Sequence, residues 1–154
     1  MSGRSTAHAT FTIERLYPAS PSRVFQAWAN PDAKRRWFAC HDDWAASDYA
    51  LDFRVGGRER VTSTPPNAEP HHYDAIYRDI VPDRRIIYSY DMRLGEVRIS
   101  VSLATVELEP HEGGTRLTLT EQAVFLDGYD DPDARDREEG TRIGLENLAK
   151  VLQP

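Results

Sequence analysis

The sequence predicts an α+β fold in which a curved antiparallel sheet of six to seven strands surrounds one long helix near the C-terminus. Between residues 47 and 125 the apolar residues recur mostly with the two-residue period of strands. Residues 131–153 instead carry apolar residues at helical spacing. Strands that are segregated from helices in this way favour an antiparallel sheet over alternating βαβ units.

The first strand is expected from Thr10, because Phe11 and Ile13 alternate with polar residues. Residues 1–9 are small and polar, and we expect them to form a flexible tail. Residues 10–154 are then one domain, which suits a chain of 154 residues with 40% apolar side chains.

Two short helices are predicted after this strand. Ser20 is a favoured N-cap residue, and Pro21 fits the first helical position, where no backbone N–H is needed. Asn30 and Pro31 end this helix and begin a second one, which brings Trp37 and Phe38 to its end.

The middle of the chain predicts strands with one mainly apolar face toward the concave side of the sheet. In the segment 96–110 we place Val101 and Leu103 on this face, with a bulge near residues 103–105 where the apolar alternation reverses. In the segment 115–125 the same face carries Leu119 and Glu121.

The glycine pair in "RVGGRER" lies between two segments with strand-like alternation. A phosphate-binding loop would instead need its glycines to open a helix. We therefore interpret Gly56 and Gly57 as a two-residue hairpin turn, in which both residues take a positive φ.

A closing helix is predicted from Asp131 and Pro132, with acidic residues in its first turns as the helix dipole favours. Gly140 and Gly144 lie one turn apart on it, and we expect them either to permit close packing on the sheet, the simpler interpretation, or to let a ligand approach.

One helix covers only part of a curved sheet, so the sequence predicts a cavity between them, the usual setting for a small-molecule site. Four tyrosine hydroxyls on one predicted face support this, because each would need a partner in a filled core. The predicted lining residues are Trp37, Phe38, Phe53, Tyr73, Tyr77, Tyr88, Tyr90, Met92, Val101, Leu103, Leu119, Glu121, Thr141 and Leu145.

The composition argues against several classes of partner and location. A formal net charge of -6 disfavours nucleic acid, and no apolar run approaches the ~20 residues of a membrane span. The N-terminal residues lack the apolar core of a signal peptide, and a single cysteine fits a reducing compartment. We expect a cytoplasmic protein of unspecified oligomeric state.

Two charged residues are candidates for chemistry on the concave face. Glu121 is either a desolvated acid or base that acts on or anchors a ligand, or a strand-end carboxylate paired with an arginine. Arg15 either holds a ligand carboxylate or serves as a structural partner at the sheet edge.

Histidine and cysteine residues do not predict a metal site. The run Cys40–Trp44, together with His71 and His72, matches no zinc-ligand spacing. Cys40 and His41 are adjacent, and neighbours in sequence rarely align as a nucleophile and its base. We expect neither a metal nor another cofactor.

The order and spacing of several segments resemble the SRPBCC (START/Bet v 1-like) superfamily, and most closely its branch named after the C-terminal domain of the activator of Hsp90 ATPase. The likeness covers about residues 10–152 and is carried by "ERLYPASPSRVFQAWANPDAKRRWF", "FRVGGRERV", "YRDIVPDRRIIYSYDM", "GGTRLTLTE" and "EEGTRIGLENLAKVL". Many relatives have a tryptophan directly after the glycine of the closing helix, where this chain has Thr141.

The resemblance implies a helix-grip fold with a deep, mostly apolar cavity. Such relatives bind lipids, hormones, polyketides or other hydrophobic ligands, and a minority are cyclases or aromatase-like enzymes. Hsp90 activation is not carried over, because the eukaryotic co-chaperone has a further N-terminal domain.

Three functions therefore remain open. The first is a binding module for a hydrophobic, lipid-, polyketide- or aromatic-like small molecule. The second is an enzyme of cyclase or hydratase type that uses Glu121 or a tyrosine as acid or base. The third is a protein-interaction domain of the chaperone-partner kind. The apolar lining has the stronger support in the residues, which favours the first.

Overall fold

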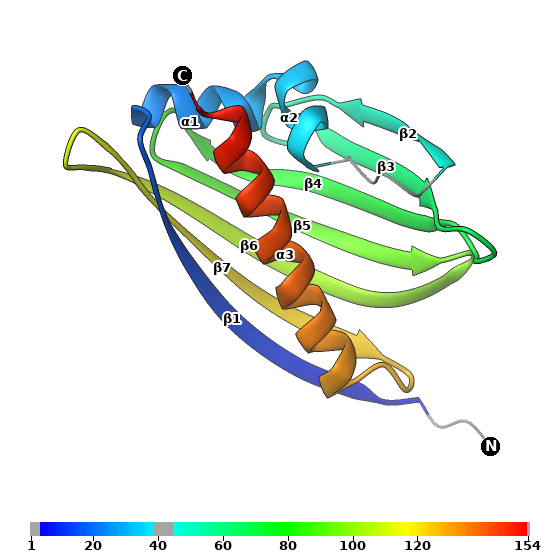
Figure 1. Cartoon of the computed structure of the whole chain (residues 1–154). Coiled ribbons are helices and arrows are strands. Elements are labelled where there is room, and N and C mark those ends of the chain that lie inside the picture. Colours follow the sequence, from blue (N-terminus) through cyan, green and yellow to red (C-terminus); the bar gives the residue numbers. More distant parts are fainter. Residues whose placement is uncertain (1–3, 39–44, 154) are drawn as a thin grey trace.

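The computed structural model describes residues 4–38 and 45–153 of the chain. Its strands form one seven-stranded sheet in the order β1-β7-β6-β5-β4-β3-β2, and every neighbouring pair is antiparallel. The α+β, helix-grip prediction is confirmed: the sheet curves around a long C-terminal helix (Figure 1). The strands are β1 (Thr6–Tyr17), β2 (Ala45–Leu51), β3 (Arg58–Thr64), β4 (His71–Val81), β5 (Arg85–Leu94), β6 (Val97–His111) and β7 (Gly114–Leu126).

Strand β1 begins at Thr6, four residues before the predicted start, so residues 6–9 belong to the sheet and not to a tail. Thr6 pairs with Leu126 at the far end of β7. Just beyond this pair, the Ser5 N–H donates to the Asp127 side chain (3.0 Å). Backbone pairing with the full length of β7 thus extends the strand through residues whose side chains carry little apolar signal.

The two short helices α1 (Pro21–Ala29) and α2 (Pro31–Phe38) close one end of the curved sheet (Figure 1). The Ser20 hydroxyl accepts from the backbone N–H of Arg23 (3.2 Å), so it caps α1 as the sequence predicts. The Asn30 side chain caps α2 in the same way. The Trp37 indole donates to the Ala27 carbonyl (2.9 Å) and fixes the two helices to each other.

Helix α3 (Asp131–Val151) crosses the concave face of the sheet obliquely and ends beside α1 (Figure 1). Its C-terminal half buries Leu145 and Leu148, and the Tyr17 hydroxyl donates to the Leu145 carbonyl (2.9 Å). Between residues 132 and 144, no α3 side chain is fully buried. Helix α3 is therefore packed on the sheet at its C-terminal half only.

Strand β6 shows where the predicted alternation was wrong. Val101 and Leu103 lie on the convex face, with 40% and 39% of their surface exposed. The irregularity in pairing falls near Arg98, opposite the Met92/Arg93 step of β5, and not near residues 103–105. The concave positions of β6 therefore begin with small polar residues, which in the sequence resemble a solvent-facing side: Ser100, Ser102, Ala104, Val106 and Leu108.

The glycine pair does not form the predicted two-residue hairpin, because β2 ends at Leu51 and β3 begins at Arg58. Only Gly56 takes a positive φ (83°). A Cβ at Gly57 would collide with the Asp52 carbonyl oxygen, so this position needs glycine for close approach. The pair adjoins β4, since the Gly56 N–H donates to the Tyr77 carbonyl (2.8 Å) and the Tyr77 N–H donates to the Gly57 carbonyl (3.0 Å).

A buried ion pair connects α2 to the sheet. The side chains of Lys34 and Glu59 are both 0% exposed, and the ammonium donates to both carboxylate oxygens at 3.0 Å. The hydroxyls of Tyr49 and Tyr77 also donate to this carboxylate, at 2.7 and 2.8 Å. Burial lowers the pKa of Lys34, and the nearby Glu59 carboxylate opposes this shift. The ammonium also lies 4.2 Å from the centre of the Phe38 ring, a cation–π contact.

Replacement of Lys34 by Met should lower the free energy of unfolding by about 3–5 kcal/mol, because the carboxylate of Glu59 stays buried without its counter-charge. In the double variant Lys34→Met, Glu59→Gln we expect more than half of this loss to return. Urea unfolding followed by tryptophan fluorescence measures both values.

The control for this prediction is Arg60→Ala, which removes an exposed ion pair with Asp74 (3.1 Å). An exposed pair is worth about 1 kcal/mol or less. Equal losses in Lys34→Met and Arg60→Ala would contradict a structural role for the buried pair.

Candidate functional site

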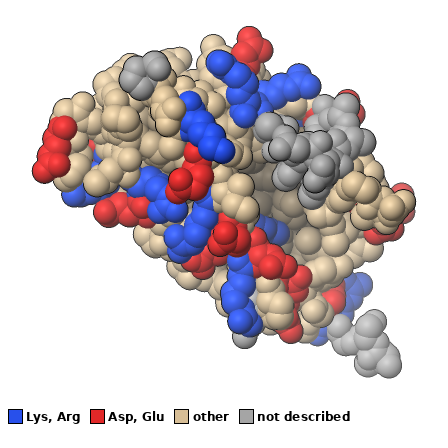
Figure 2. Space-filling view, in the orientation of Figure 1, with Lys and Arg blue, Asp and Glu red and all other residues tan. Residues whose placement is uncertain are grey.

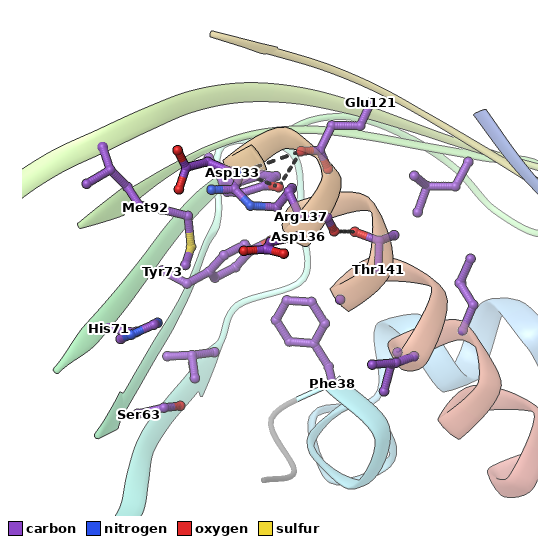
Figure 3. A pocket seen from close by; sticks show the side chains of 18 of the residues that line it. Phe38, Ser63, His71, Tyr73, Met92, Glu121, Asp133, Asp136, Arg137 and Thr141 are labelled. Atoms are coloured by element: carbon purple, nitrogen blue, oxygen red, sulfur yellow. Dashed lines mark hydrogen bonds and ion pairs between the residues drawn. The ribbon is translucent and has the colours of Figure 1, made fainter. Parts of the chain in front are cut away.

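A cavity of about 620 Å³ lies between the concave face of the sheet and the N-terminal half of α3. It opens to solvent beside α3, where the space-filling view shows a recess (Figure 2). Phe38 of α2, Tyr73 of β4, Met92 of β5 and Thr141 of α3 face this space from different sides (Figure 3). Its volume is in the range of about 300–1,000 Å³ that is typical of small-molecule sites.

Most of the predicted lining residues lie around this cavity. They come from α2, β4, β5, β7 and α3, which meet only in the folded chain: Trp37, Phe38, Tyr73, Tyr88, Tyr90, Met92, Leu119, Glu121, Thr141 and Leu145. The remaining four lie elsewhere. Phe53 and Tyr77 pack in the core, with their ring centres 4.9 Å apart. Val101 and Leu103 lie on the convex face.

The inner wall of the cavity is largely aromatic. The Tyr73 ring lies 5.0 Å from that of Phe38 and 4.8 Å from that of Tyr90, measured between ring centres. Tyr88 continues the row toward Trp28 of α1, at 6.5 Å. Rings at these distances form a continuous apolar surface whose polar atoms need partners.

A polar cluster lies where α3 crosses β5, β6 and β7 (Figure 3). The Tyr90 hydroxyl donates to the Glu121 carboxylate (2.6 Å), and the guanidinium of Arg137 lies 3.6 Å from the same carboxylate oxygen. Arg137 also donates to the hydroxyls of Ser100 (2.8 Å) and Ser102 (3.4 Å). Ser100 and Ser102, on the concave side of β6, therefore help to hold Arg137 of α3 against the sheet by accepting its hydrogen bonds.

Glu121 has features of both hypotheses made from the sequence, a desolvated carboxyl group and a carboxylate paired with an arginine. Its side chain is 3% exposed, and it is paired with an arginine. Burial raises the pKa of Glu121, whereas the hydrogen bond from Tyr90 and the charge of Arg137 limit the rise. Arg15 does not join this cluster. It pairs with the exposed Glu146 of α3 (3.0 Å), which fits its reading as a structural partner.

The face of α3 above the cavity carries small residues. Gly140 and Gly144 both line the cavity, and a Cβ built on either would have no heavy atom within 4 Å. The prediction that these glycines permit close packing on the sheet is therefore wrong. They leave open space, and Thr141 between them turns its hydroxyl back to the Arg137 carbonyl (2.9 Å).

Arg137 and the pair Lys34–Glu59 were not predicted from the sequence. A signal for each existed. Arg137 precedes Thr141 and Leu145 at intervals of four residues, so it shares their face of the helix. Lys34 has the same relation to Trp37 and Phe38, three and four positions on. Charged residues on an apolar helical face indicate buried partners elsewhere in the fold.

The segment Cys40–Trp44 lies outside the described residues. In residues 4–38 and 45–153, no group of three or more histidine, cysteine or carboxylate side chains could hold a metal ion. Within the same residues, no helix is both long enough and apolar enough to cross a membrane.

The model of the family described as "Activator of Hsp90 ATPase homolog 1-like protein" matches residues 18–153. No curated protein matches the chain.

Among solved structures, the chain is similar to an uncharacterized protein from Rhizobium leguminosarum, with 56% identity over 97% of both chains and a TM-score of 0.91. It is also similar to protein Mll3558 from Rhizobium loti, with 49% identity over 96% of this chain and 99% of the other, and a TM-score of 0.89. Protein CV1439 from Chromobacterium violaceum shares the fold at 24% identity, with coverage of 95% and 99% and a TM-score of 0.73.

Replacement of Arg137 by Gln should make stability depend on pH. Loss of the guanidinium raises the pKa of Glu121 further, so the folded state holds its proton more tightly than the unfolded state does. The free energy of unfolding then falls as pH rises above about 4.5, the ordinary value for this group. By pH 8 we expect a deficit of roughly 2–4 kcal/mol relative to the parent chain.

Urea unfolding at several pH values between 5 and 8 measures this slope. The double variant Arg137→Gln, Glu121→Gln is the control, because it lacks the titrating carboxylate and should lose the added pH dependence. A deficit in Arg137→Gln that stays constant with pH would contradict the ion pair.

Proposed function

The chain belongs to the activator of Hsp90 ATPase homolog 1-like family, and on this premise we propose that it binds a hydrophobic small molecule in the cavity beneath α3. The observation that carries the proposal is the cavity itself, about 620 Å³ with an aromatic inner wall. Protein interiors are normally packed without voids of this size. An open, mainly aromatic recess of this size has the dimensions and the lining that small-molecule sites usually have.

The arrangement of α3 supports a binding role. Leu145 and Leu148 anchor its C-terminal half, whereas Gly140 and Gly144 place no side chain in the cavity that they line. Glycine within a helix costs about 1 kcal/mol relative to alanine. Two glycines above the cavity thus cost stability and provide volume, which suits a helix that covers a ligand.

The state of Glu121 favours binding over acid–base catalysis. Its carboxylate accepts from Tyr90 and faces Arg137, so its position is set by a structural network. A general acid or base needs a proton that it can exchange with a bound substrate. We therefore prefer a binding module to the cyclase or hydratase alternative.

Filling the cavity from the helix should abolish binding. We expect Gly144→Leu to weaken the binding of Nile red, an uncharged hydrophobic dye, at least tenfold, because the new side chain occupies the open space beside this residue. The variant should unfold at a higher urea concentration than the parent, since leucine is the better helix former by about 1 kcal/mol. Nile red fluorescence titration and urea unfolding provide the two measurements.

Glu139→Leu is the matched control, because it adds the same side chain to an exposed position of α3 that does not line the cavity. Its affinity for Nile red should stay within twofold of the parent. Unchanged dye binding in Gly144→Leu would overturn the proposal and favour an interaction domain whose cavity is not used.

A further inference from the structure

The charges along the cavity disfavour an anionic ligand. Among its described lining residues are three carboxylates, Glu121, Asp133 and Asp136, and one guanidinium, that of Arg137. Asp133 and Asp136 lie on α3 close to Arg137 (Figure 3). A carboxylate on the ligand would meet this excess of negative charge.

Arg137 is also not available as an anion receptor. Its guanidinium faces Glu121 (3.6 Å) and donates to Tyr90 (3.2 Å) and Ser100 (2.8 Å). A ligand carboxylate would compete with Glu121 for this charge, and displacement of Glu121 would leave its side chain buried without a counter-charge. Among the lining residues that the structure describes, the one guanidinium is thus already paired with a carboxylate of the protein.

Two hydrogen-bond donors in the wall are without partners. The Tyr73 hydroxyl and the Trp28 indole N–H are buried and have no hydrogen-bond partner among the described residues. Both residues line the cavity and are 9% and 1% exposed. Buried polar groups of this kind nearly always have a partner in folded proteins.

The chemistry of these donors specifies what would satisfy them. An indole N–H donates and cannot accept, and a tyrosine hydroxyl donates readily to a carbonyl or ether oxygen. Both residues line the cavity, and Tyr73 is the more exposed of the two at 9%, so its hydroxyl is the donor that a side-chain rotation brings most readily to a ligand oxygen. The neighbouring rings of Phe38, Tyr88 and Tyr90 suit a flat, apolar body.

From these observations we infer that the ligand is an uncharged aromatic or conjugated molecule with an acceptor oxygen, and that Tyr73 donates to this oxygen. The inference rests on the proposed function and narrows it. It separates ketones, esters and ethers from free fatty acids and other carboxylates, although both groups are hydrophobic enough to enter an apolar cavity.

Three probes with one naphthalene frame test the inference: 2-acetylnaphthalene, 2-ethylnaphthalene and 2-naphthoate. Displacement of Nile red from the full chain at pH 7.5 measures the affinity of each. We expect 2-acetylnaphthalene to bind at least tenfold more tightly than 2-naphthoate, because the anion meets the carboxylates and finds Arg137 occupied.

The role of Tyr73 is tested by the ratio of the affinities for 2-acetylnaphthalene and 2-ethylnaphthalene, which cancels the difference in hydrophobicity between variants. In Tyr73→Phe this ratio should fall 3- to 10-fold. The variant should fold normally, since the hydroxyl that it lacks has no protein partner among the described residues. Tyr17→Phe is the matched control, because Tyr17 is not among the residues that line the cavity and its hydroxyl donates to the Leu145 carbonyl, so its ratio should not change.

The outcomes separate the inference from the proposed function. If 2-naphthoate binds as tightly as the ketone, or if Tyr73→Phe leaves the ratio unchanged, the ligand class is wrong while the binding function stands. If neither Nile red nor any of the three probes binds, the proposed function itself fails.

Discussion

The ion pair between Arg137 of α3 and Glu121 of β7 connects the N-terminal half of the helix to the sheet across the cavity. Between residues 132 and 144, α3 has no fully buried side chain, so ordinary apolar packing does not hold this part of the helix to the sheet. A long guanidinium side chain spans the distance, and Glu121, Tyr90 and two serines of β6 receive it. The cavity exists because this connection is made by one extended side chain and not by a packed layer.

The carboxylates of the two buried ion pairs accept hydrogen bonds from most of the tyrosine hydroxyls around them. Tyr49 and Tyr77 donate to Glu59, and Tyr90 donates to Glu121. Buried carboxylates need several donors to offset their loss of hydration, and these hydroxyls supply them. The Tyr73 hydroxyl is buried and has no hydrogen-bond partner in the part of the chain that the structure describes, so it is the hydroxyl that we propose donates to a ligand.

Position along the sheet also explains which polar residues are structural. Near α1 and α2, the Lys34–Glu59 pair lies behind the aromatic wall and does not line the cavity. Near the start of α3, the Arg137–Glu121 pair forms part of the wall. Both pairs orient one helix on the sheet, so the aromatic surface between them keeps a defined shape.

The order of elements, the antiparallel sheet and most of the aromatic lining could be predicted from the sequence, because these depend on local periodicity and on residues that favour helix starts. Ser20 caps its helix as predicted, and Tyr73, Tyr88 and Tyr90 share the face that alternation assigns to them. Local patterns report which side of a strand or helix is apolar. Local patterns do not report which residues of other elements contact that side.

The errors therefore fall where a distant partner changes the meaning of a residue. Ser100 and Ser102 have the polarity of an exposed face, and they are buried because Arg137 arrives from a helix 35 residues later in the chain. For the same reason, Val101 and Leu103 were assigned to the wrong side of β6. The glycines of α3 suit either close packing or an approaching ligand, and only the folded chain shows that open space lies beside them. The sequence by itself determined the fold and the apolar character of its concave face. Only the tertiary structure decided which charges pair across that face, and that the Tyr73 hydroxyl has no partner among the described residues. Those pairings depend on contacts between elements that lie far apart in the chain.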